Sequence, residues 1–360
     1  MSTFLFLSDL SLKILPFFLA GVFINFCISS LWKKNFFRSL GLKNYRADHR
    51  VHEGEVPRLG GLVIFSLFLI FFLNFSDIEI SNFVYICSLS LIPACFASIK
   101  EDLFHNVRPA LRFLALLLSA TLFVIYFKSE LPSLSNTFLS PLFSLKIMYP
   151  FFYIIALVAI ANGCNLLDGM NGLCAISVIA SLVSLFIISM NVGDLQIMTI
   201  TFVMTIIILS FFAINYPLGK IFLGDFGAYF LGLFLGMFTI IFFGKHNELS
   251  RWLAVLVLIY PFTEVSFSLF RRLFSRRSIY KPDNNHLHSL VYLTLKNNSL
   301  SKSFANPGVL LSMVFFWAYP ILSIYYCLNR PYLIGIFIFS YFALYSIVYS
   351  YLNNFVKNTK

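Results

Sequence analysis

Residues 148–192 read MYPFFYIIALVAIANGCNLLDGMNGLCAISVIASLVSLFIISMNV, and this stretch decides the fold class. Two apolar runs, beginning near Met148 and Leu173, each approach the roughly twenty residues that a helix needs to cross a bilayer. Between them lies a segment of amides, glycines and one carboxylate, from Asn162 to Gly172. Non-helical backbone at membrane depth must line a cavity or be buried in protein. The segment therefore predicts a binding loop between two membrane helices.

The rest of the chain has the same character. Of its 360 residues, 59% are hydrophobic and 11% are charged, whereas soluble domains carry about 25% charged residues. We therefore expect a single all-α integral membrane domain over residues 1–360, with about 10–11 transmembrane helices. The other apolar runs begin near Leu10, Gly60, Phe83, Leu111, Leu195, Ala228, Trp252, Val309 and Pro331.

The basic residues predict the orientation in the membrane, because cytoplasmic loops are rich in Lys and Arg. If alternate connections are placed inside, 20 of the 26 basic residues fall there or on the C-terminal tail. This split predicts an outside N-terminus and an inside C-terminus. The inside residues are Lys33, Lys34, Arg38, Lys43, Arg46, Arg50, Arg58, Lys100, Arg108, Arg112, Lys220, Arg271, Arg272, Arg276, Arg277, Lys281, Lys296, Lys302, Lys357 and Lys360.

Polar clusters gather in the same inside connections. Glu101 and Asp102 stand together at the end of an apolar run. Acids at the C-terminal end of a helix oppose its dipole, which argues against a merely solvated helix end. Adjacent carboxylates also suppress one another's ionisation and attract a divalent cation. Asp168 lies in the loop described above, and Asp225 lies between Gly224 and Phe226 in a second glycine-rich connection.

Two histidines, His286 and His288, complete this set in the last inside loop. Their spacing matches no common zinc motif, so contact with phosphate or proton transfer is the better chemical interpretation. Magnesium takes oxygen ligands and commonly completes its shell with substrate phosphate. Carboxylates interleaved with cations on one face thus predict magnesium-dependent phosphoryl transfer at the membrane surface, with neither substrate identified.

Five motifs in this order resemble the polyprenyl-phosphate N-acetylhexosamine-1-phosphate transferase family. That family includes the phospho-MurNAc-pentapeptide translocase and the enzymes that start O-antigen and teichoic acid linkage synthesis. The resemblance covers roughly residues 50–290. The motifs are PxxGG (Pro57, Gly60, Gly61), an acidic pair (Glu101, Asp102), NxxDGxxGL (Asn165, Asp168, Gly169, Gly172, Leu173), Asn215 with FxGDxG (Phe222, Gly224, Asp225, Gly227), and PDxxHLH (Pro282, Asp283, His286, Leu287, His288).

The resemblance implies transfer of a sugar 1-phosphate from a UDP-sugar to undecaprenyl phosphate in a bacterial cytoplasmic (inner) membrane, with release of UMP. It implies Mg²⁺ as cofactor, with Mn²⁺ as a substitute. The implied metal ligands are Asp225 and Asp168. The implied catalytic residues are Glu101, Asp102, Asp168, His286 and His288. The implied substrate-binding residues are Arg58, Arg108, Arg112, Asn165, Asn171, Asn215, Lys220, Phe222 and Gly224.

Three departures separate this chain from other members of the family. Glu101 stands where the acidic pair usually begins with Asp, which makes a general acidic role for the pair more secure than a base role for this residue. Asn171 stands where the peptidoglycan branch has Asp, and Ser289 where many members have a third His. The last motif resembles the branch that starts O-antigen and teichoic acid synthesis. We therefore expect a UDP-N-acetylhexosamine substrate.

Two other functions were considered. A transporter or lipid flippase should place ionisable residues near the middle of the membrane, often at broken helices. Glu264, preceded by Pro261, is the best candidate of that kind, but the other notable acids lie in inside loops. A catalytically inert relative is the second alternative, suggested by Glu101. Membrane lipid is an expected partner and nucleic acid is not, and the sequence leaves open whether the chain forms a homodimer.

The charge distribution makes a direct prediction of topology. A reporter fused after Lys360 should be active only in its cytoplasmic form, and a reporter placed before Met1 only in its external form. Paired fusions to a periplasmic phosphatase and a cytoplasmic fluorescent protein measure this. An external signal after Lys360 would show that one crossing had been miscounted, near Met148 or Leu195.

Overall fold

The computed structural model describes residues 3–33, 56–75, 78–133, 148–274, 285–297 and 301–358. Within these ranges all the regular elements are helices, which confirms the all-α prediction. They are α1 (Thr3–Lys33), α3 (Gly60–Phe75), α4 (Ile78–Phe104), α5 (Pro109–Tyr126), η1 (Lys128–Glu130), α7 (Met148–Leu167), α8 (Leu173–Val192), α9 (Leu195–Asn215), α10 (Gly224–Lys245), α11 (Trp252–Val257), α12 (Ile259–Phe274), α13 (Leu287–Asn297), α14 (Lys302–Ser312), α15 (Val314–Cys327), η2 (Pro331–Leu333) and α16 (Ile334–Asn358).

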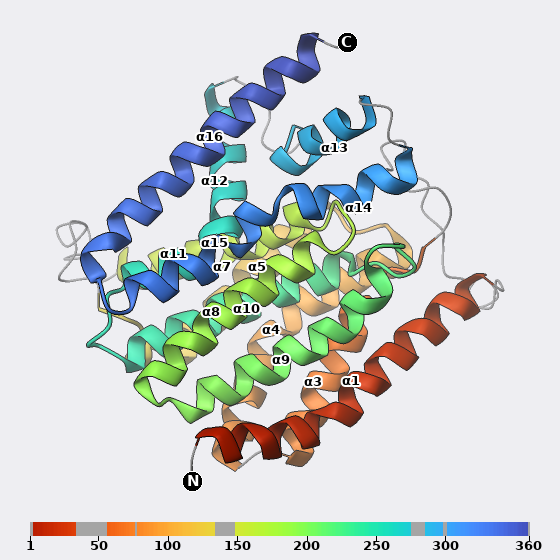
Figure 1. Ribbon diagram of the computed structural model, residues 1–360. Helices are drawn as coiled ribbons and strands as arrows, with labels where there is room; N and C mark the ends of the chain where they lie inside the picture. The colour runs from red at the N-terminus through yellow and green to blue at the C-terminus, as the bar shows by residue number, and fades with distance from the viewer. Residues whose placement is uncertain are drawn as a thin grey trace.

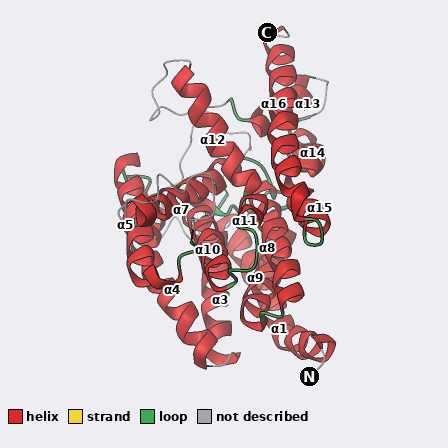
Figure 2. Ribbon diagram, turned by 90° about the vertical axis from the view of Figure 1, so that its left-hand side faces the viewer, coloured by secondary structure: helices red, strands yellow, loops and turns green. Residues whose placement is uncertain are grey.

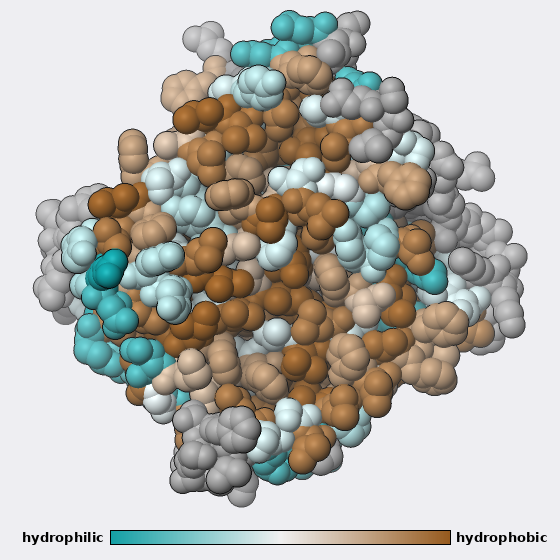
Figure 3. Space-filling model, in the orientation of Figure 1, coloured by the Kyte–Doolittle hydropathy of each residue, from teal (hydrophilic) through white to brown (hydrophobic). Residues whose placement is uncertain are grey.

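The helices form a membrane-spanning bundle. In the described ranges, nine helical segments are long and apolar enough to cross a bilayer, and α3 is a shorter apolar helix. The other expected run, which begins near Trp252, is divided between α11 and α12. The start of α1 and the end of α16 lie at opposite ends of the bundle (Figures 1 and 2). Hydrophobic residues dominate the outer face, and hydrophilic residues gather near its edges (Figure 3).

Helix α10 is the centre of the bundle. Every residue from Gly224 to Phe243 is buried, so no side of this helix faces lipid. It packs against α7, where Gly232 lies against the backbone of Ala161. Small residues let helix backbones approach closely inside a membrane. On another side, rings of α10 meet rings of α3, including Phe234 and Phe68 with centroids 5.0 Å apart.

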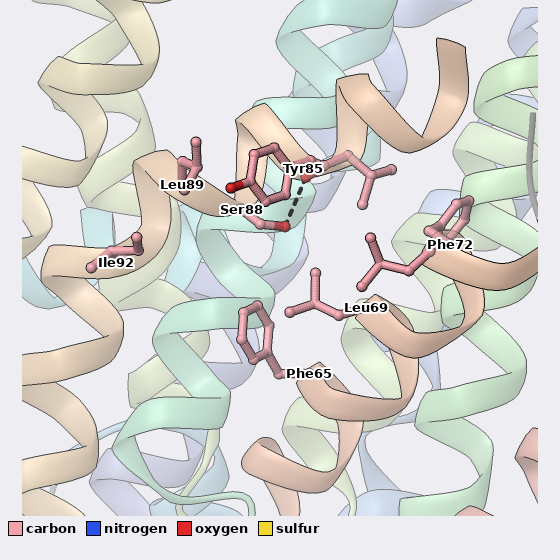
Figure 4. Close-up of a pocket in the computed structure, with 9 residues that line it drawn as sticks. Phe65, Leu69, Phe72, Tyr85, Ser88, Leu89 and Ile92 are labelled. Atoms are coloured by element: carbon pink, nitrogen blue, oxygen red, sulfur yellow. Dashed lines mark hydrogen bonds between the residues drawn. The ribbon is translucent and has the colours of Figure 1, made fainter. Parts of the chain in front are cut away.

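An apolar groove lies between α3 and α4 (Figure 4). No charged side chain lines it, and the Ser88 hydroxyl donates to the Val84 backbone carbonyl within its own helix at 2.7 Å. The groove is therefore an apolar surface, and none of the residues of the polar motifs lines it. Its lining residues are Phe65, Leu69, Phe72, Leu73, Val84, Tyr85, Ser88, Leu89 and Ile92.

The contact between α10 and α7 predicts a stability difference between two glycine substitutions. A Cβ at Gly232 would lie 2.6 Å from Ala161 Cα, so Gly232→Ala should destabilise the protein by about 1–3 kcal/mol through overpacking. A Cβ at Gly335, in α16, meets nothing within 4 Å. Gly335→Ala should therefore be neutral or slightly stabilising. Thermal unfolding of both variants in detergent measures the difference, and equal melting temperatures would contradict the packing argument.

Candidate active site at the start of the central helix

The first turn of α10 is capped by a carboxylate from another helix. A helix N-terminus leaves backbone N–H groups without intrahelical partners. Asp102, in α4, accepts hydrogen bonds from the backbone N–H groups of Asp225 at 3.0 Å and Phe226 at 2.8 Å. Gly224 has φ 80°, and a Cβ there would lie 2.6 Å from the Asp102 carboxylate. Only glycine fits this position without strain. The cap fixes the position of Asp225 in the first turn of α10.

Two arginines bind the carboxylate of Asp225. Arg58 Nη2 lies 2.6 Å from Asp225 Oδ1, and Arg58 Nε lies 3.2 Å from Asp102 Oδ1. Arg112, in the first turn of α5, pairs with the other oxygen of Asp225. Asn165 donates to Asp225 Oδ1 at 3.4 Å. Three segments far apart in sequence thus converge on the carboxylate of Asp225.

Asp168 belongs to the same electrostatic cluster. Burial raises its pKa well above the usual value, Arg58 opposes this, and the negative charges of Asp225 and Asp102 raise it further. The cluster therefore combines three carboxyl groups with two guanidinium groups. A bound phosphate or cation would therefore change the net charge of this cluster.

The donor set of this cluster suits magnesium. Asp225, Asp168 and Asn165 offer the oxygen atoms that hard cations prefer. Among the described residues no three acidic, histidine or cysteine side chains already form a metal cage. Magnesium is commonly held by one or two carboxylates and completed by substrate phosphate and water. Asp225 and Asp168 would be its protein ligands.

The two members of the acidic pair have different hydrogen-bond partners. Glu101 Oε2 accepts a hydrogen bond from the Val107 backbone N–H at 2.9 Å, whereas Asp102 faces α10. Adjacent residues of an α-helix point about 100° apart, because the helix has 3.6 residues per turn. The two carboxylates are therefore directed to different neighbours.

Two asparagines join the loops around the site. Asn215 accepts from the Gly172 backbone N–H at 2.6 Å and donates to the Ile221 carbonyl at 2.7 Å. Its amide therefore bonds to the protein on both sides and fixes the loop before α8 to the loop before α10. Asn171 donates to the Pro217 carbonyl at 2.9 Å. Its backbone N–H donates to Asn306 at 2.9 Å, a residue that the sequence analysis missed because no motif marks it.

The PxxGG segment forms a short ladder with the segment before Asp225. Gly60 and Gly61 donate backbone hydrogen bonds to the carbonyls of Phe222 and Leu223, each at 3.0 Å. Phe222 N–H donates to the Pro57 carbonyl at 2.8 Å. This pairing carries Arg58 into the cluster.

The remaining predicted residues lie in connections between helices or beyond the described ranges. Lys220 and Phe222 are half-buried between α9 and α10, and Arg108 is exposed directly before α5. Pro282 and Asp283 of the last motif, and the basic segment from His49 to Glu55, lie outside the described residues.

The two histidines of the last motif lie together, and His288 reaches the loop that carries Asp168. Their rings are parallel, with centroids 5.4 Å apart and an interplanar angle of 2°. His288 Nε2 lies 3.0 Å from the position that a Cβ of Gly169 would occupy. Both imidazoles also lie next to Glu264. From the sequence, this residue was a candidate only for a transport function. The sequence signal for a functional role of Glu264 was an acidic residue inside an apolar helix.

The chain is similar to known transferases. Residues 83–243 match the family model described as glycosyl transferase family 4. A probable undecaprenyl-phosphate N-acetylglucosaminyl 1-phosphate transferase of Bacillus subtilis is 26% identical over 251 residues, 69% of each chain. An undecaprenyl-phosphate alpha-N-acetylglucosaminyl 1-phosphate transferase of Thermotoga maritima is 30% identical over 244 residues, which is 68% of this chain and 70% of the relative.

A phospho-N-acetylmuramoyl-pentapeptide-transferase of Streptococcus pneumoniae is 27% identical over 253 residues, 67% of this chain and 76% of the relative. Both branches considered in the sequence analysis are thus represented at similar identity. The stretch that matches the family model, residues 83–243, includes the acidic pair and the segments that surround Asp168 and Asp225. The chain belongs to the polyprenyl-phosphate sugar-1-phosphate transferase family.

Proposed function

We propose that the protein transfers an N-acetylhexosamine 1-phosphate from a UDP-sugar to undecaprenyl phosphate, releases UMP, and so starts a lipid-linked surface glycan such as an O-antigen. One observation carries this proposal. Asp225 is surrounded by Arg58, Arg112 and Asn165 at the buried start of a membrane helix. Relatives whose names include undecaprenyl-phosphate N-acetylglucosaminyl 1-phosphate transferase support the choice of substrates.

In the proposed reaction an oxygen of the lipid phosphate forms a bond to the phosphorus that carries the sugar. The bond from that phosphorus to the bridging oxygen breaks, and this oxygen leaves with UMP. Bound Mg²⁺ or Mn²⁺ would neutralise charge on the diphosphate. Arg58 and Arg112 would exchange Asp225 for phosphate oxygens, which bind guanidinium groups well. Asp102 would remain on the helix cap, so its contribution is to hold Asp225 in place.

The lipid substrate would approach along α5. Arg108 and Arg112 lie in or next to its first turn, and Leu111 and Leu114, in its first two turns, are exposed. An amphipathic lipid needs this combination, because its phosphate requires cations while its chain remains in an apolar surface. We assign the lipid phosphate to these two arginines.

A transporter is the less favoured function. Its best candidate residue, Glu264, is 1% exposed and lies against His286 and His288. It therefore belongs to the same end of the bundle as the acidic cluster. Family membership also favours an enzyme.

The metal role of Asp225 predicts the outcome of a single substitution. Asp225→Asn should reduce activity by more than about 100-fold, since changes next to metal ligands already cost about 10–100-fold. EDTA should abolish wild-type activity, and Mg²⁺ or Mn²⁺ should restore it. Transfer is measured as UMP release by purified protein.

The matched control is Asp9→Asn, which makes the same chemical change at an exposed ion pair with Lys13. Exposed pairs contribute little to stability, so this variant should retain wild-type activity. Full activity of Asp225→Asn, or of the wild type in EDTA, would contradict the metal role.

The proposed substrate class predicts the mass of the lipid product. Purified protein, Mg²⁺ and undecaprenyl phosphate should convert a UDP-N-acetylhexosamine and leave UDP-MurNAc-pentapeptide unreacted. Mass spectrometry of the extracted lipid should find one N-acetylated sugar on a diphosphate. A pentapeptide-bearing lipid would place the protein in the peptidoglycan branch instead.

A further inference from the structure

Glu264 is an acid buried inside α12. Its side chain is 1% exposed, and neither carboxylate oxygen has a donor in ordinary hydrogen-bond geometry among the described residues. An uncompensated charge in such a place is costly, and proteins normally pair it. The nearest nitrogens of basic side chains belong to the last motif: His286 Nδ1 at 3.4 Å from Oε2 and His288 Nδ1 at 3.8 Å from Oε1.

The other groups facing Glu264 are uncharged phenols. Tyr260 lies one turn before it in α12, and Tyr341 and Tyr345 come from α16, which packs beside it. All three are almost completely buried. Within the described chain, the two imidazoles are therefore the only basic groups placed to balance this carboxylate.

The segment carrying the histidines is anchored close by. Arg271, farther along α12, donates to the Asn285 backbone carbonyl and to the Tyr349 hydroxyl at 3.0 Å. His286 directly follows this anchor, and α13 begins at Leu287. The approach of both rings to Glu264 is thus set by helices on either side of the loop.

The two nitrogens of His288 face different partners. Nδ1 faces Glu264, and Nε2 faces the turn of Asp168 and Gly169. A carboxylate at one ring nitrogen fixes the proton there and orients the ring, which determines what the other nitrogen can do. Gly169 has no side chain, so nothing of its own fills the space in front of Nε2.

We propose that Glu264 is a positioning residue that holds the Nδ1 protons of His286 and His288 and thereby directs Nε2 of His288 towards phosphate oxygens of the substrate at the Asp168–Gly169 turn. The direction towards substrate phosphate rests on the proposed function. The pairing of Glu264 with the two rings does not rest on the proposed function, because it is a property of the protein without substrate.

Histidine-selective ¹⁵N NMR of the full-length protein in detergent tests the pairing. In the wild type, the signals assigned to His286 and His288 should show a proton on Nδ1. His286→Gln and His288→Gln make the assignment, since each removes one signal. Glu264→Gln keeps the volume and removes the negative charge, and it should shift both rings towards the tautomer protonated on Nε2.

Kinetics test the positioning role. In Glu264→Gln, kcat should fall by about 10–100-fold, while KM for the UDP-sugar should stay near its wild-type value, because the residue touches no substrate. Glu264→Asp, which restores the charge on a shorter side chain, should recover part of kcat and part of the Nδ1 proton signal. A merely structural role would lower the melting temperature without this recovery.

The matched control is Glu248→Gln. Glu248 lies 2.9 Å from His246 Nδ1 in an exposed contact after α10, and thus makes the same type of pair at the other end of that helix. Its loss should change the His246 signal and leave kcat unchanged. If this variant lowered kcat as much as Glu264→Gln, the effect would not be specific to the site.

Two results would overturn the proposal: wild-type His286 and His288 protonated on Nε2 alone, or a folded Glu264→Gln with wild-type kcat. If Glu264→Gln fails to fold, the Nδ1 proton signals of the wild type and the kcat of Glu264→Asp still test the proposal. If the spectra agree but no UDP-sugar is used, the proposed function fails while the pairing of Glu264 with the histidines stands.

Discussion

The contact on which the site depends is the carboxylate of Asp102 at the N-terminus of α10. Two backbone N–H groups donate to it, and the helix they begin is buried over its whole length from Gly224 to Phe243. Because this helix start is buried, an unpaired backbone donor there would cost about 1–3 kcal/mol. The cap satisfies these donors and also fixes the position of the next functional group, Asp225.

The arrangement around this cap explains why cations and carboxylates occur together in a chain with so few charges. Arg58 and Arg112 neutralise Asp225 in the protein alone. Both guanidinium groups also suit phosphate, so in the proposed reaction the substrate phosphates would bind them and Asp225 would be released to a cation. Binding of substrate and of metal would then favour one another. The phosphate would balance the charge of the guanidinium groups, and the cation would balance the charge of the Asp225 carboxylate.

The loops between the membrane helices are folded against one another instead of being solvated. Asn215 and Asn171 bond to backbone groups of neighbouring loops, and Gly60 and Gly61 pair with the segment before Asp225. Amide side chains can satisfy a donor and an acceptor at once, which buried irregular backbone requires. The polar residues of the motifs therefore divide into those that build the site and those that face into it, and Asn215 belongs to the first group.

The sequence alone determined the all-α membrane fold, the approximate start of each apolar run, the gathering of polar motifs in a few connections, and the family. These properties depend on hydropathy and on short motifs, which are local in the chain. It could not determine the direction of any side chain. Asp102 and Asp225 are 123 residues apart, and Glu264 contacts histidines beyond a loop. Only the packing of α4, α10 and α12 decided that Asp102 caps a helix, that Glu101 turns away from it, and that Glu264 meets the last motif. The physical reason is that a helix presents each side chain to whichever neighbour packs on that face, and the neighbour is set by the tertiary structure.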